Sequence, residues 1–177
     1  DDSRTIRLRS RLTTDHPIDV GWVESSIDFD PPPVGAPSLP QQPAFQRTAM
    51  AVGADGPMFL AYAYIREFGG IATNWAVSLL GSTDGGTSWR CLNPVVMEGL
   101  SQQGHTIRLS VSGDWLRLDA VDLNDDLISC ASRDGGLTFS EKATTELPTP
   151  FQGGTTNVDP SPFAVTGVGG GRFILAF

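Results

Sequence analysis

One eight-residue pattern occurs twice in this chain and constrains its fold more than any other feature. Ser82–Trp89 and Ser132–Phe139 both follow Ser-x-Asp-Gly-Gly-x-(Ser/Thr)-aromatic, and their first residues are 50 positions apart. The aspartate side chain accepts hydrogen bonds from backbone N–H groups of the residues that follow it, and glycine adopts positive φ in tight turns. Each copy therefore predicts a hairpin, and a hairpin repeated at this spacing predicts a β-sheet unit that is used more than once.

The residue types in these turns favour a structural role over a chemical one. The aspartates would stabilise the hairpins, and the closing aromatic residues begin the next strands, where their rings can be buried. A catalytic or calcium-binding role would need both carboxylates in one site, whereas repeats one unit apart lie on different units. Structural roles are therefore predicted for Ser82, Asp84, Gly86, Trp89, Ser132, Asp134, Gly136 and Phe139.

The pattern resembles the Asp-box, or bacterial neuraminidase repeat, of sialidases and many other β-propellers, and we call the two copies the first and second box. In that family the box joins the third and fourth strands of a four-stranded blade, on the face away from the active site. The resemblance implies an all-β fold, a β-propeller of four-stranded antiparallel blades, with about two and a half blades in this chain. It leaves the chemistry open.

Alternating apolar runs, bounded by Gly, Asp and Asn turns, divide the rest of the chain into strands. The expected strands are Thr48–Val52, Met58–Ile65, Trp75–Leu80, Trp89–Leu92, Thr106–Val111, Trp115–Val121, Leu127–Ala131, one from Phe139 onward, Pro162–Val165 and Arg172–Phe177. The expected organisation is arginine-rich N-terminal strands at 1–28, a proline-rich connector at 29–46, blades at 47–97 and 98–150, and an incomplete third blade at 151–177.

Further blades are an expected partner, because propellers close with about four to eight of them. We expect these blades from the same longer polypeptide or from a second chain, and assembly of identical copies is the remaining alternative. A third-blade strand ending in Phe173–Phe177 would be an aggregation-prone edge if it stayed unpaired.

The charge and composition exclude several partners. The net charge is −8, which argues against binding to nucleic acid because phosphate contacts need many Lys and Arg side chains. No apolar stretch approaches the roughly 20 residues that cross a bilayer, so no membrane span is predicted. The Asp-box resemblance implies an extracytoplasmic protein, whether secreted, periplasmic or on the cell surface.

Neither a disulfide nor a cofactor is predicted. Cys91 and Cys130 fall on strands that need not be adjacent, so we expect two buried free thiols rather than a bridge. The acidic stretch Asp122–Asp126 could offer oxygen ligands to calcium, but a polar hairpin explains it equally well and the spacing of an EF-hand is missing. Calcium stays an alternative to the absence of any cofactor.

The end of the blades opposite the boxes is where the resemblance places a site. Loops from successive blades emerge together there, and they carry acids, an arginine and a histidine. Ligand-binding roles are predicted for Arg66, Glu67, His105, Asp122, Asp125, Asp126 and Asp159. No catalytic residue is assigned, since Tyr62 and Tyr64 lie within a strand and are expected to be packing residues rather than a sialidase nucleophile.

These patterns predict a non-catalytic glycan- or protein-binding or scaffold module of an exported protein. Paired acids on the loops leave a sialidase-like glycoside hydrolase as one alternative, although the chain lacks the Phe/Tyr-Arg-Ile-Pro motif that opens the sialidase catalytic domain. A structural subunit, whose other chain completes the propeller, is the second alternative.

Overall fold

The computed structural model describes residues 5–10, 23–28, 48–68, 71–100, 107–122, 124, 126–146 and 163–176. These residues form twelve β-strands joined by turns, and no helix occurs among them. A helix of membrane-spanning length and hydropathy is accordingly not found in this part of the chain. The all-β class expected from the sequence is confirmed.

The first four-stranded sheet contains β3 (Thr48–Val52), β4 (Met58–Phe68), β5 (Ile71–Ser82) and β6 (Arg90–Leu100), paired antiparallel in chain order. β3 has the predicted bounds, because a hydrogen-bonded turn at 53–57 ends it. β4 and β5 run beyond their predicted bounds, and β6 begins one residue later and ends eight residues later than predicted. Register shifts at β-bulges let the pairing continue where the apolar alternation is broken.

The second four-stranded sheet has the same plan. It contains β7 (Ile107–Ser112), β8 (Trp115–Val121), β9 (Leu127–Ser132) and β10 (Ala143–Thr145), again antiparallel and in chain order. Both sheets therefore have the strand count and order expected of propeller blades.

The fourth strand of the second sheet begins later than predicted. A strand was expected from Phe139 onward, but the ladder starts at Ala143. The Ser140 N–H donates to the Ala131 carbonyl at 2.8 Å, while the Ala131 N–H donates to the Ser140 Oγ at 3.1 Å. The prediction was wrong here because a side-chain oxygen takes the place of the backbone acceptor that would have continued the ladder.

Two further pairs of strands are each antiparallel and two-stranded. β11 (Ala164–Gly169) pairs with β12 (Arg172–Ala176), and β1 (Thr5–Ser10) pairs with β2 (Val23–Asp28). β11 and β12 correspond to the first two strands of the other sheets, because β11 contacts β7 as β7 contacts β3.

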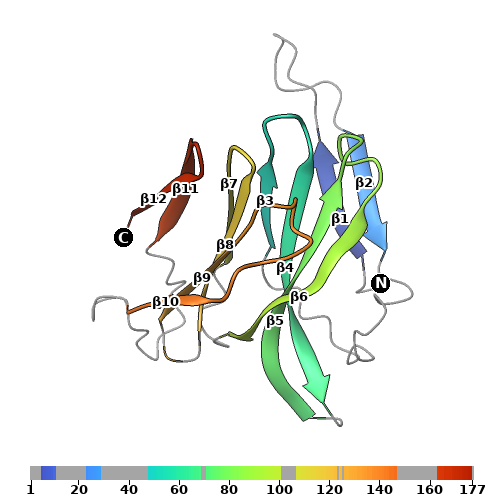
Figure 1. The fold of residues 1–177 in the computed structure, drawn as a ribbon. Coiled ribbons are helices and arrows are strands. Elements are labelled where there is room, and N and C mark those ends of the chain that lie inside the picture. Colours follow the sequence, from blue (N-terminus) through green and yellow to red (C-terminus); the bar gives the residue numbers. More distant parts are fainter. Residues whose placement is uncertain are drawn as a thin grey trace.

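The three C-terminal sheets are stacked through their first strands. β3 contacts β7, and β7 contacts β11, so that Figure 1 shows the three sheets following one another from the middle to the left of the view. The main core lies between the first two sheets and includes Phe59, Leu79 and Leu118, while a smaller cluster of Val121, Leu127 and Phe163 lies between the second and third.

The third sheet approaches the second very closely. A Cβ added to Gly167 of β11 would lie 1.9 Å from the backbone oxygen of Val111 in β7. The Gly171 N–H also donates to the Ser112 carbonyl at 3.2 Å. The run of glycines at the β11–β12 turn therefore permits backbone contact between sheets that larger residues would prevent.

Both cysteines are free thiols, as predicted. Cys130 is buried in the main core, and burial raises the pKa of its thiol to about 12. The expectation that Cys91 is also buried was wrong, because Cys91 lies on β6, the outermost strand of its sheet, and is exposed.

Candidate functional site

The first box is a closed hydrogen-bonded turn between β5 and β6. The Ser82 hydroxyl donates to the Asp84 Oδ1 at 2.7 Å and accepts the Gly86 N–H at 2.9 Å. The Asp84 carboxylate accepts the Ser88 N–H at 2.9 Å and the Ser88 hydroxyl at 2.6 Å. Both oxygens of this carboxylate therefore have partners within the turn itself.

The second box repeats these contacts between β9 and β10. The Ser132 hydroxyl donates to the Asp134 Oδ1 at 2.7 Å and accepts the Gly136 N–H at 2.9 Å, and the Thr138 N–H donates to the same carboxylate at 3.0 Å. Gly86 and Gly136 have φ of 87° and 89°, a conformation that favours glycine. The two turns thus occupy equivalent positions in two different sheets.

The electrostatics of the boxes agree with a structural role. Hydrogen bonds from Ser88 and Ser82 hold the pKa of Asp84 below its usual range, and those from Thr138 and Ser132 do the same for Asp134. Such a carboxylate stays ionised and cannot act as a general acid at neutral pH.

The closing aromatic residues hold the boxes against the sheets. The Trp89 indole N–H donates to the Gly86 carbonyl at 3.0 Å, and its ring packs against the cluster of Leu60, Tyr62 and Leu80. Phe139 packs instead against the core between the first and second sheets.

The opposite end of the sheets carries the predicted ligand-binding residues. The β8–β9 loop is closed by Asp122, whose Oδ1 accepts the Asn124 N–H at 2.7 Å and the Asp126 N–H at 3.0 Å. The Asp122 carboxylate therefore stabilises its own loop, which is the role that a polar hairpin, rather than a calcium loop, gives to it. Asp126 lies at the end of the same loop.

An isolated bridge brings this loop to the first sheet. Leu100, at the end of β6, pairs with Asp122, and Leu100 also pairs with Trp75 of β5. Trp75 in turn pairs with Ile65, the residue before Arg66. Since neighbouring strands are about 4.8 Å apart, the Arg66 backbone lies about 10 Å across the sheet from Leu100, at nearly the level of Asp122.

The structure thus places four of the seven predicted binding residues at one end of the two sheets. These are Arg66 and Glu67 in the last part of β4, and Asp122 and Asp126 in the β8–β9 loop. The side chains of Arg66 and Glu67 lie outside the described residues, as do His105, Asp125 and Asp159 entirely.

A buried ion pair, which the sequence analysis missed, lies on the face of the second sheet toward the third. The Arg117 guanidinium donates through Nε to both oxygens of Asp119, at 2.9 and 3.0 Å, and its second nitrogen donates to Oδ1 at 2.7 Å. The Ser129 hydroxyl donates to the same oxygen at 2.6 Å. The Asp119 side chain has 0% exposure, and that of Arg117 has 24%.

This ion pair has the geometry of a structural anchor. Every contact of the Asp119 carboxylate goes to the protein, and the Arg117 guanidinium stacks over the ring of Phe173 in β12, 5.6 Å from its centroid. Asp119 lies between Leu118 and Ala120 in a strand that is buried on both faces, and the sequence of that strand alone does not show this burial. An ionised residue there requires a partner.

The two tyrosines are packing residues, as predicted. Tyr62 and Tyr64 are buried in the cluster on the other face of the first sheet, and the Tyr64 hydroxyl donates to the Pro94 carbonyl at 3.1 Å. Burial raises the pKa of Tyr62 to about 12. Neither phenol is placed to attack a substrate as a nucleophile. Among the residues that the structure describes, no cluster of His, Cys, Asp and Glu could hold a metal ion.

No model of a protein family matches the chain, and no curated protein matches it. Among solved structures, it is similar to the Hadza microbial sialidase Hz136, with 18% sequence identity and a TM-score of 0.45. The similarity covers 70% of this chain and 22% of that one, so the chain spans less than a quarter of that sialidase.

Proposed function

We propose that the chain is part of a β-propeller that serves as a non-catalytic glycan- or protein-binding or scaffold module of an exported protein. The observation that carries this proposal is the contact of successive first strands, β3 with β7 and β7 with β11. Propeller blades are four-stranded sheets arranged around a central channel, so the first strands of neighbouring blades lie beside one another. Loops on such a rigid scaffold are common positions for binding residues.

Apolar side chains on two outer faces support the presence of further blades. Val52 of β3 is 58% exposed on the face away from the second sheet, and Ile174 of β12 is 55% exposed on the corresponding outer face of the third. Between the first two sheets, Leu109 and Val111 of β7 are packed in the core. Leu60 and Tyr62, on the same face of the first sheet as Val52, are already buried. A further sheet beside β3 or β12 would cover the apolar side chains that stay exposed there.

Four of the described carboxylates are held in structural contacts, which supports a non-catalytic role for these four. Asp84, Asp134 and Asp122 are bonded to backbone amides of their own turns, and Asp119 is sealed in an ion pair. A glycosidase needs one protonated and one ionised acid that reach the same substrate. None of these four acids has that freedom.

The binding role is proposed for the end opposite the boxes. Arg66, Glu67, Asp122 and Asp126 lie at that end, and arginine and carboxylate groups hydrogen-bond well to sugar hydroxyls and to polar protein groups. The exported location is proposed from the Asp-box resemblance, and no nucleic acid is proposed as a partner of a chain with net charge −8.

A glycan array together with a panel of aryl glycosides tests this proposal. We expect binding without turnover, and we expect it to weaken in Arg66→Ala and Asp126→Asn. Asp114→Asn is the matched control, because it removes one charge at the box end of the second sheet. Turnover that is lost in Asp125→Asn would indicate a glycoside hydrolase instead of a binding module. Binding that is equally weakened by the control would refute the proposed location.

The exposed apolar side chains of β3 and β12 also favour the structural-subunit alternative. The intact mass of the native protein, compared with 18.9 kDa for these 177 residues, shows whether further blades belong to the same polypeptide. A chain that folds only with a second polypeptide would support a subunit of a larger assembly instead.

A further inference from the structure

A cleft opens between the first and second sheets at the box end, away from the proposed binding loops. It is bounded on one side by the β3–β4 turn and on the other by the β7–β8 turn and the second box. These two turns lie next to each other at the top of Figure 1. The cleft has a volume of about 290 Å³, near the lower limit of about 300 Å³ for small-molecule sites.

The cleft has an apolar interior and an acidic edge. Phe59 and Leu116, which line it, are buried, and Val111 is partly buried beside them. Asp55 and Asp114 lie on the two bounding turns and are exposed. Within the described part of the chain, neither carboxylate has an ion-pair partner. An apolar stem with a positive head is complementary to such a lining.

Arg133 is the cation among the described residues that line the cleft, and its guanidinium already has a partner. The Arg133 guanidinium lies over the Trp115 ring, 4.7 Å from its centroid. On the side of the third sheet, a Cβ added to Gly171 would come 2.4 Å from the Trp115 Nε1. The indole is thus covered by Arg133 and approached by the β11–β12 turn, so that it offers little open ring face on which a sugar could stack.

We propose that this cleft binds a basic side chain, lysine or arginine, of a partner protein. The methylene stem packs on Phe59, Val111 and Leu116, and the cationic head lies between the carboxylates of Asp55 and Asp114. The net charge of −8 attracts a basic segment over a longer range. This gives the box end an interaction role that is independent of the ligand at the opposite end.

An NMR titration of the ¹⁵N-labelled chain with blocked tripeptides tests the proposal. The probes are Gly-Arg-Gly, Gly-Lys-Gly and Gly-citrulline-Gly, the last being a neutral match for arginine. We expect the two basic peptides to shift the Trp115 indole and the Gly113 and Gly135 amide signals, and the citrulline peptide to bind several-fold more weakly. Raising the ionic strength should weaken the basic peptides, because exposed charges are screened.

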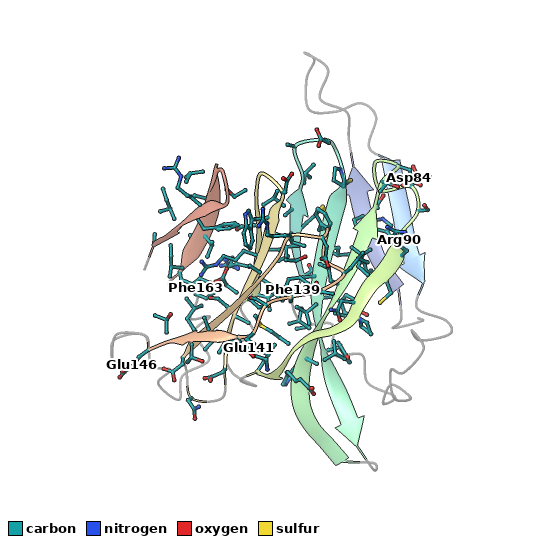
Figure 2. All side chains as sticks on the ribbon, viewed as in Figure 1. Asp84, Arg90, Phe139, Glu141, Glu146 and Phe163 are labelled. Carbon is teal, nitrogen blue, oxygen red and sulfur yellow. The ribbon has the colours of Figure 1, made fainter. Side chains whose placement is uncertain are left out.

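Variants of the chain locate the site. Asp55→Asn and Asp114→Asn should each weaken the basic peptides by roughly two- to fivefold, the range for one exposed ion pair. Glu146→Gln is the matched control, since it removes one charge at the opposite end, where Figure 2 shows Glu146 far from Asp84. Equal affinity for arginine and citrulline peptides would overturn the proposal, as would unchanged binding in both variants. Shifts of these signals by methyl glycosides and not by the peptides would make the cleft a sugar site.

Discussion

Removing one partner of the Arg117–Asp119 ion pair should destabilise this chain more than almost any other single change. The carboxylate of Asp119 has no exposure and accepts hydrogen bonds from both Arg117 and Ser129. A charge in that position cannot be rehydrated when its partner is lost. We therefore expect Arg117→Ala and Asp119→Ala to lower the free energy of unfolding by about 3–5 kcal/mol each.

The two variants should not be equal. Arg117→Ala leaves a carboxyl group with 0% exposure and without its cationic partner, whereas Asp119→Ala leaves a guanidinium whose side chain is 24% exposed and still stacks on Phe173. Water can reach the second group and not the first. Arg117→Ala should therefore lie at the upper end of the range, about 5 kcal/mol, and Asp119→Ala at the lower end, about 3 kcal/mol.

Urea unfolding followed by far-UV circular dichroism measures these losses, with the free energy in water taken by linear extrapolation. The double variant Arg117→Met/Asp119→Leu should lose much less than the two single losses together, because apolar residues of similar size replace both charges. Glu146→Ala, which removes an exposed carboxylate, should change stability by no more than about 0.5 kcal/mol. Single losses below about 1 kcal/mol, typical of exposed pairs, would refute the anchoring role.

Three further outcomes follow from the structure. The pKa values of Asp84 and Asp134 are lowered in the folded state, so the box turns stabilise the fold above the unfolded pKa of about 4. This stabilisation is lost as the pH falls through the lower folded pKa. With asparagine at both positions, the melting temperature should therefore depend less on pH between about pH 4 and 2. Gly167→Ala should cost about 1–3 kcal/mol by overpacking against β7, measured by urea unfolding, and no loss would contradict the close contact. Iodoacetamide should modify Cys91 before Cys130, as mass spectrometry would show, because Cys91 is exposed and burial raises the pKa of Cys130 to about 12.

The strands that were predicted most accurately are those with turn residues at both ends. Trp115–Val121 was predicted with its observed bounds, because Gly113 and Asp114 precede it and a polar loop follows it. The fourth strand of the first sheet, in contrast, was predicted to end at Leu92, yet β6 continues past Pro94 to Leu100. β6 is the outermost strand of its sheet, where a residue without an N–H donor is tolerated.

The buried ion pair could not be predicted from the alternation of apolar and polar residues alone. In a sheet with one face in water, a charged residue that alternates with apolar ones is expected to be exposed. β8 is covered on both faces, so the side opposite the main core meets the third sheet, and Asp119 is buried there. Finding that site from sequence would have required knowing which sheets pack on which faces, information that the residues of one strand do not carry.

The difference in strand length between the two four-stranded sheets bears on where a ligand can be held. β4 and β5 contain 11 and 12 residues, whereas β8 and β9 contain 7 and 6. At the box end the two sheets are closed by turns of one design, so the extra length emerges at the opposite end, where Figure 1 shows the β4–β5 hairpin extending beyond the other strands.

That overhang gives the loop end an asymmetry that the boxes lack. β4 is four residues longer than β8, which corresponds to about 13 Å of strand. Glu67 and Phe68 belong to the last part of β4, beyond the level at which Leu100 meets Asp122. The hairpin therefore projects past the level of the β8–β9 loop, rather than ending at the same height. The two ends therefore differ in structure. The strands of the two sheets end at unequal heights at the proposed binding end, whereas turns of the same design close both sheets at the box end.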